Sequence, residues 1–214
     1  MFSRSNRTSS PSRHPNGPDV WGPHYWYFLH WHADVSTTTF VNRTSQIAWL
    51  LRNLHMVLPC PSCAVEAYEY SSKRLEQFPY IVNDARAYVS YWRNMHNHVN
   101  RRLGKPLMII EPLRSDYSLS TWWYHCSIVI RTCIEDFASR TGPIDDCVTF
   151  VNIILDSHPS LRSSIVYHPY VVEARTRLSM EIGTPSSRRE AFVDYYNAIE
   201  TIVMQYVNEY QRVR

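Results

Sequence analysis

Glycine is scarce in this chain, with 5 glycines among 214 residues, against an average usage of about 7%. Rossmann folds, P-loops and turn-rich β-sandwiches all need glycine at fixed backbone positions, because glycine adopts the required φ angles at little cost. The composition therefore argues against nucleotide-binding folds that are built on glycine loops.

The remaining composition is typical of a globular protein. The hydrophobic fraction of 44% and the charged fraction of 19% argue against disorder. The sequence has no run of 18 consecutive apolar residues, so we expect no membrane span. The formal charge of +3 is too small to indicate nucleic-acid binding. Residues 1–19 are rich in Ser, Arg and Pro without an apolar signal region, which predicts a flexible basic tail.

Apolar residues at helical spacing follow Val20 and predict four helices before residue 104. We expect them at about residues 23–35, 40–58, 60–73 and 85–103, with a start near Pro23. The last of them has Asp84 as its cap, and Gly104 comes just past its end. Short connections between such helices are typical of a compact bundle.

The second half of the chain has a less regular pattern. Residues 107–118 read as a connector, and residues 140–143 read as a turn. The segment 122–138 fits a helix or, at 128–130, a strand, and a further helix is expected over 150–155. The clearest helix is 186–212, whose broad apolar stripe is either core or a partner surface.

Two cysteines separated by two residues, Cys60 and Cys63, are the sharpest chemical feature. At a helix start the first thiolate faces the positive end of the dipole, which favours thiol exchange. The same pair could supply half of a zinc site, but the sequence has no second pair, and His96 and His98 point to different faces of a helix. A thioredoxin motif would follow a strand, whereas the preceding residues have a helical pattern. An inert buried pair is the remaining alternative.

One face of the fourth expected helix combines an aromatic ring, an imidazole and an amide, from Trp92, His96 and Asn100. Buried polar groups need partners, so this face is either a core tryptophan beside surface groups or a wall for a flat heteroaromatic ligand. Trp26 and His30 repeat the spacing of four on the first helix. Two such faces and a dithiol suggest a redox cofactor inside a bundle.

Several short blocks follow one another along the first half of the chain: Trp21-Gly22-Pro23, Trp26, Leu29-His30, Pro59-Cys60 with Cys63, Trp92, His96-Asn97 with Val99-Asn100, and Leu103-Gly104-Lys105-Pro106. In order and approximate spacing these blocks resemble the Erv/ALR family of FAD-linked sulfhydryl oxidases. The resemblance covers about residues 20–117. It implies a helical bundle with FAD at its mouth, usually a homodimer. It also implies oxidation of protein dithiols to disulfides, with electrons passed to O2 to give H2O2.

The resemblance also implies roles for individual residues. Cys60 would be the exposed cysteine that exchanges with the substrate thiol, and Cys63 would lie against the flavin and pass two electrons to it. No metal is expected. The implied FAD-binding set is Gly22, Trp26, His30, Cys63, Trp92, His96, Asn97, Val99, Asn100, Leu103, Lys105 and Tyr117.

The sequence departs from the cellular members of the family in two places. They commonly have a cysteine shortly after the Gly-Lys-Pro block, whereas residues 107–111 contain none. A family tryptophan that closes over the flavin corresponds, by spacing, to Tyr117. The minimal core resembles the oxidases of large DNA viruses more, so we expect a viral protein in the virion or host cytoplasm. A cellular member would be expected in the mitochondrial intermembrane space.

Three further cysteines, Cys126, Cys133 and Cys147, follow the region of resemblance. On one helix Cys126 and Cys133 would be about 10 Å apart, which exceeds the disulfide limit of about 7 Å. Cys133 and Cys147 flank the expected turn and could form a structural or shuttle disulfide. Three buried free thiols are the alternative.

The sequence therefore predicts an all-α protein with three parts. Residues 1–19 form the tail, and residues 20–117 form a four-helix-bundle flavin core with a fifth short helix. Residues 118–214 form a smaller, mainly helical C-terminal domain without an assigned role. The expected function is that of an FAD-dependent thiol oxidase, and the alternative is a non-catalytic, zinc-stabilised helical interaction protein.

Overall fold

The computed structural model describes residues 17–108, 118–140, 144–161, 164–180 and 184–212. Every regular element in these ranges is an α-helix or a 3-10 helix, which confirms the predicted all-α class. No helix in the described ranges has the length and apolar character needed to cross a membrane. In chain order the elements are α1 (Pro18–Ser36), η1 (Phe40–Arg43), α2 (Thr44–Asn53), η2 (Leu54–Val57), α3 (Pro61–Gln77), η3 (Pro79–Asn83), α4 (Ala85–Arg102), α5 (Leu119–Ser139), α6 (Asp145–Ser157), α7 (Pro169–Met180) and α8 (Pro185–Arg212).

The first helix begins earlier than predicted, at Pro18 rather than near Pro23. The prediction was wrong because the apolar spacing was counted from Trp26, whereas the structure also buries Trp21, which precedes Pro23. In the structure Pro18 occupies the first turn, where its missing N–H leaves no hydrogen bond unmade. Pro23 lies inside the helix. The helix ends at Ser36, where the Ser-Thr run predicted its end.

The segment predicted as one helix over 40–58 is three consecutive elements, η1, α2 and η2. Short 3-10 turns at the ends of an α-helix are common, and their apolar spacing is close to that of the helix. The expected inner face is nevertheless buried, with Ile47, Leu50 and Leu51 at 0% exposure.

The third and fourth helices have the predicted starts. α3 begins directly after Cys60 and extends to Gln77, beyond the predicted end near residue 73. The backbone N–H of Ala87 donates to Asp84 Oδ1 at 2.8 Å, which confirms the predicted cap of α4. Gly104 has a φ of 65°, a left-handed conformation that favours glycine after a helix end.

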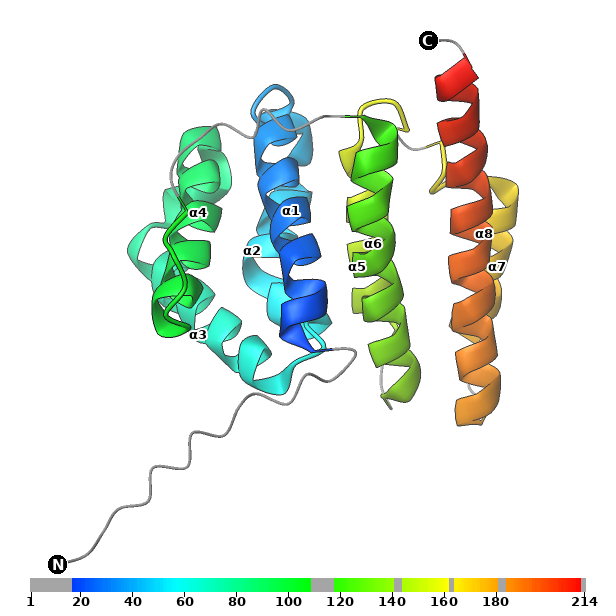
Figure 1. The fold of residues 1–214 in the computed structure, drawn as a ribbon, viewed down its shortest axis with the longest axis horizontal. Coiled ribbons are helices and arrows are strands. Elements are labelled where there is room, and N and C mark those ends of the chain that lie inside the picture. Colours follow the sequence, from blue (N-terminus) through cyan, green and yellow to red (C-terminus); the bar gives the residue numbers. More distant parts are fainter. Residues whose placement is uncertain (1–16, 109–117, 141–143, 162–163, 181–183, 213–214) are drawn as a thin grey trace, which may run out of the picture.

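Helix α1 lies between α4 and α5 in a row that continues to α8 (Figure 1). Phe150 of α6 packs into this core against Tyr25 and Phe28, with ring centroids 5.9 and 5.7 Å away. It also stacks on Trp49 of α2 at 6.1 Å. Residues far apart in the sequence therefore share one hydrophobic core.

The regular elements of the C-terminal half, in the described residues, are all α-helices. α5 is continuous through residues 128–130, so the helix alternative is confirmed over the strand. α8 matches its predicted range, whereas α7 was not predicted. Most of the α8 stripe is buried core: Ala191, Phe192, Tyr195, Tyr196, Ile199, Ile202 and Val203. Residues 109–117 and 141–143, in the predicted connector and turn, lie outside the described residues. The division at residue 117 stays a prediction, and α5 packs on both α1 and α8.

Candidate active site

The two predicted catalytic cysteines form a disulfide at the start of α3. Cys60 is the N-cap residue, and the backbone N–H of Cys63 donates to its Sγ at 3.2 Å. Ser62 Oγ lies 3.3 Å from the same sulfur. Both cysteines are partly exposed. The first sulfur therefore receives the helix-terminal N–H that the sequence pattern predicts.

The chain just before Cys60 is held by side chains from distant helices. Tyr25 Oη donates to the carbonyl of Val57 at 2.9 Å. The Arg140 guanidinium donates to the carbonyls of Met56 and Leu58, at 3.0 and 3.1 Å. Sequence reasoning missed Tyr25 and Arg140, because no local pattern links residues so far apart.

The predicted aromatic and imidazole groups of α1 and α4 meet. His30 Nε2 lies 3.0 Å from His96 Nδ1. The rings of Trp26 and His96 are stacked, with centroids 4.2 Å apart and planes 6° apart. The structure thus brings together three residues of the predicted FAD-binding set, from two helices.

The two histidines are neutral at pH 7. Burial, and then the nearby His96 and Arg93, lower the pKa of His30 to about 3. Burial, and then the charge of Lys105, lower the pKa of His96 to about 4. In this neutral pair one imidazole donates and the other accepts.

The predicted residues at the end of α4 hold the chain that follows the helix. Asn97 accepts from the Met108 backbone N–H at 2.7 Å and donates to its carbonyl at 3.4 Å. Asn100 donates to the carbonyl of Pro106 at 3.1 Å. Lys105 forms an exposed ion pair with Asp19 at 3.2 Å. The side-chain amides of Asn97 and Asn100 thus form hydrogen bonds within the protein.

The other predicted FAD-binding residues are placed differently. Trp92 is fully buried, with edge contacts to Tyr88 and Tyr91. Val99 is half-buried and Leu103 is exposed. The backbone of Gly22 faces open space, since an added Cβ would meet no atom within 4 Å. The remaining predicted residue, Tyr117, lies outside the described residues.

Side-chain contacts link α3 to α4. Glu66, one turn after Cys63, pairs with Arg102 at 2.8 Å. Further along the helices, Ser71 Oγ lies 2.6 Å from Tyr91 Oη. Glu66 therefore connects α3 to the C-terminal end of α4, near Val99 and Asn100 of the predicted set.

The other cysteines are free and buried. Cys133 Sγ lies 3.5 Å from Cys147 Sγ across α5 and α6, at hydrogen-bond rather than bonding distance. The structure therefore has the three buried free thiols, and not the disulfide alternative. Burial raises the pKa of the Cys126 and Cys133 thiols, which keeps both protonated.

Within the described ranges, His, Cys, Asp and Glu nowhere form a group of three or more that could hold a metal ion. The Cys60 and Cys63 sulfurs are bonded to each other, and a disulfide does not supply thiolate ligands.

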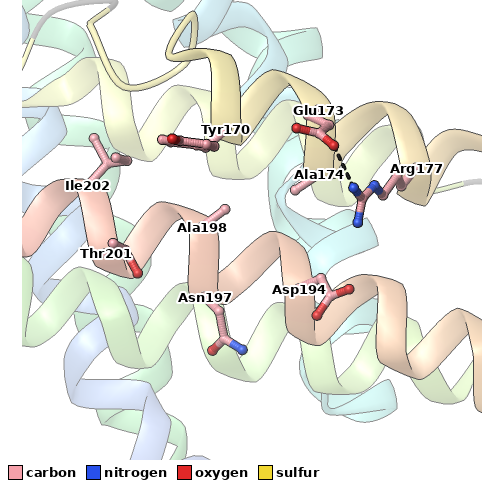
Figure 2. Close-up of a pocket in the computed structure, with 9 residues that line it drawn as sticks. All are labelled: Tyr170, Glu173, Ala174, Arg177, Asp194, Asn197, Ala198, Thr201 and Ile202. Atoms are coloured by element: carbon pink, nitrogen blue, oxygen red, sulfur yellow. Dashed lines mark hydrogen bonds and ion pairs between the residues drawn. The ribbon is translucent and has the colours of Figure 1, made fainter.

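A groove of about 490 Å³ lies between α7 and α8 (Figure 2). These helices are at the opposite end of the molecule from α3, at whose start the disulfide lies (Figure 1). Glu173 and Arg177 on its wall pair with each other. The full lining is Tyr170, Glu173, Ala174, Arg177, Asp194, Asn197, Ala198, Thr201 and Ile202. None of these residues belongs to the predicted site.

Comparison with known proteins places this arrangement in a family. Residues 23–126 match the model of the Erv1/Alr family. The chain is 31% identical over 103 residues to the FAD-linked sulfhydryl oxidase of African swine fever virus (isolate Tick/Malawi/Lil 20-1/1983), covering 47% of this chain and 82% of that protein. No solved structure matches the chain.

Two further viral relatives are provisionally named FAD-linked sulfhydryl oxidases. One, from Invertebrate iridescent virus 6, is 30% identical over 97 residues, covering 42% of this chain and 86% of the relative. The other, from Frog virus 3 (isolate Goorha), is 29% identical over 125 residues, covering 54% and 77%. With an identity of 30% over most of a relative's length, this chain belongs to the Erv1/Alr family.

Proposed function

We propose that the protein is an FAD-dependent sulfhydryl oxidase that uses the Cys60–Cys63 disulfide to oxidise dithiols of protein substrates. The observation that carries the proposal is this partly exposed disulfide at the start of α3, within the segment that matches the Erv1/Alr family. The relatives named above are called FAD-linked sulfhydryl oxidases, which supports both the cofactor and the reaction.

The residues present fit FAD. Trp26 and His96 offer flat rings to a heteroaromatic group, and the open space at Gly22 admits a close approach to the backbone. Because the rings of Trp26 and His96 already touch, a third ring would stack outside the pair. The bond between His30 and His96 leaves one nitrogen on each ring for a ligand. Lys105 adds a positive charge suited to a pyrophosphate.

The first step is a thiol–disulfide exchange. A substrate thiolate attacks Cys60 Sγ, the bond to Cys63 breaks, and Cys63 leaves as a thiolate. Cys60 and the substrate sulfur are then joined in a mixed disulfide. We assign Cys60 as the attacked sulfur from the family resemblance.

The second step releases the oxidised substrate. The second substrate thiol loses its proton to solvent and attacks the substrate sulfur of the mixed disulfide, which displaces Cys60 as a thiolate. The Cys63 N–H and the positive end of α3 stabilise this leaving group. The substrate has lost two electrons and two protons, and the cysteine pair holds the two electrons. Bound FAD supplies an acceptor for this electron pair and a path to O2, which gives H2O2.

Absorption spectroscopy and peroxide measurement test the proposal directly. We expect the purified protein to show flavin absorbance and to produce H2O2 from a dithiol such as dithiothreitol. Cys63→Ser should abolish turnover, whereas the matched control Cys126→Ala, at a buried cysteine of α5, should retain it. A folded, colourless protein that FAD does not reconstitute would contradict the proposal.

We also propose a homodimer located in the virion or host cytoplasm. The support is the family resemblance for the dimer and the viral origin of the relatives for the location. Light scattering should give twice the chain mass of 25.3 kDa, and a monomer mass would contradict the dimer. Immunogold labelling of infected cells and virions would test the location.

A further inference from the structure

Three consecutive backbone carbonyls immediately before the redox disulfide are held by two side chains. Arg140 Nη1 donates to Met56 at 3.0 Å, Tyr25 Oη to Val57 at 2.9 Å, and Arg140 Nη2 to Leu58 at 3.1 Å. Carbonyls at a loop entry usually bond to water or to neighbouring backbone. Two hydrogen bonds from one guanidinium fix the orientation of two peptide groups at once.

Arg140 comes from outside the segment that matches the family. It is the C-cap residue of α5, whereas the match ends at residue 126. We infer that Arg140 is a positioning residue for Cys60, through which the C-terminal half of the chain sets the redox equilibrium of the Cys60–Cys63 disulfide.

The guanidinium is itself held in place from two sides. Its Nη2 forms an ion pair with Asp136, one turn earlier on α5. Its central carbon lies over the Phe137 ring, 4.9 Å from the centroid. An arginine with both a charge partner and a ring contact loses little additional freedom when it bonds to the carbonyls.

The connection from this clamp to Cys60 Sγ is short and stiff. Pro59 lies between Leu58 and Cys60, and its ring fixes its φ angle. The Cys60 sulfur is then positioned by few free torsions. In the reduced protein, this restriction keeps the two thiols close, and so favours closure of the disulfide.

Loss of the clamp should therefore make the disulfide easier to reduce. The freed segment must be ordered again each time the bond closes, which costs conformational entropy. A net hydrogen bond of about 1 kcal/mol corresponds to about a fivefold change in an equilibrium constant. For Arg140→Ala we expect the equilibrium constant for reduction to rise about fivefold or more.

The test measures this equilibrium on the full-length protein in glutathione redox buffers. The reduced fraction of Cys60–Cys63 is quantified by alkylation and mass spectrometry of the peptides that contain them. Arg140→Lys keeps the charge but loses the two-pronged donor, so it should give an intermediate shift. The matched control is Arg131→Ala, at an arginine of the same helix that bonds to Tyr196 instead, and it should leave the equilibrium unchanged.

A purely structural role for Arg140 would lower the melting temperature without shifting the redox equilibrium of the folded protein. Equilibrium constants equal to wild type in folded Arg140→Ala would overturn the inference. If Arg140→Ala does not fold, the same comparison with Arg140→Lys decides. The inference rests on the proposed redox role of the disulfide. The measurement on the wild-type protein distinguishes failure of the proposed function from failure of the inference. A wild-type disulfide that does not exchange with glutathione removes the proposed function, whereas exchange that Arg140 does not alter removes only the inference.

Discussion

His30 of α1 and His96 of α4 are hydrogen bonded through ring nitrogens 3.0 Å apart. Burial holds the pKa of both imidazoles far below 6.5, at about 3 and about 4. The contact between the two helices therefore depends on a pair of neutral rings. Protonation of both would replace one hydrogen bond by the repulsion of two cations.

This relationship predicts that the folded state loses stability on acidification. Each lowered pKa means that the unfolded chain binds a proton which the folded chain excludes, between about pH 6.5 and the folded value. The free energy of unfolding should fall by up to about 1.4 kcal/mol per pH unit for each such histidine. Urea unfolding between pH 7.5 and 4.5 measures the slope. His30→Gln should reduce this slope by about the contribution of one histidine. An unchanged slope would contradict the lowered pKa of His30.

Gly22 and Gly104 should respond to alanine in opposite ways. Gly22→Ala, inside α1, should raise the free energy of unfolding without FAD by about 0.5–1 kcal/mol, because alanine is the better helix former. Gly104→Ala should lower it by about 1–2 kcal/mol, because its φ of 65° strains an alanine. Denaturant unfolding of the apoprotein measures both.

Gly22→Ala should also weaken FAD binding, since its methyl group would occupy the open space at the backbone. Fluorescence titration of the apoprotein with FAD measures this effect. An unchanged dissociation constant for Gly22→Ala would show that this space is not used by the cofactor.

Asn97 should be needed to hold the chain after α4. Its amide bonds to both backbone groups of Met108, so Asn97→Ala should cost about 1–3 kcal/mol in unfolding free energy. Hydrogen exchange of the Met108 amide should also accelerate. Asn94→Ala, at an exposed position of the same helix, is the matched control and should change neither quantity. Equal exchange rates in both variants would argue against the Asn97 contact.

The buried thiols should be unreactive in the native protein. Cys126, Cys133 and Cys147 are each 0% exposed, so iodoacetamide should not modify them under native conditions. After denaturation without reductant, all three should be alkylated, and a reductant should add Cys60 and Cys63. Intact mass spectrometry counts the adducts. A Cys133–Cys147 pair that alkylates only after reduction would contradict the free-thiol structure.

Phe150 should contribute strongly to the free energy of unfolding, because it packs the C-terminal half of the chain against the N-terminal half. Its ring is fully buried against residues of α1 and α2, so Phe150→Ala should cost about 3–5 kcal/mol. Phe78→Ala, at an exposed phenylalanine, should cost far less.

Truncation after residue 117 removes all helices from α5 onward, and we expect that fragment to aggregate. A soluble, monodisperse fragment would instead support the predicted boundary there.

Features with local causes were readily predicted from the sequence. Asp84 caps α4 through a bond to a residue three positions away, and Gly104 ends the helix by its own φ angle. The Cys60–Cys63 pair and the histidines of the fourth helix could be recognised because their residues are separated by short, fixed spacings. Helix boundaries were predicted less accurately, since α1 begins at Pro18 and not at the predicted Pro23.

The helical class, the Cys60–Cys63 pair and the family resemblance can be recognised from the sequence, because these depend on residue types at short separations. The tertiary structure was needed to show that Arg140 contacts Leu58, 82 positions earlier, and that Cys133 and Cys147 meet as thiols. It also shows that the side chains of Asn97 and Asn100 bond to backbone groups of the segment after α4. Such contacts depend on how whole helices pack, and amphipathic spacing shows which face is buried without showing what lies against it.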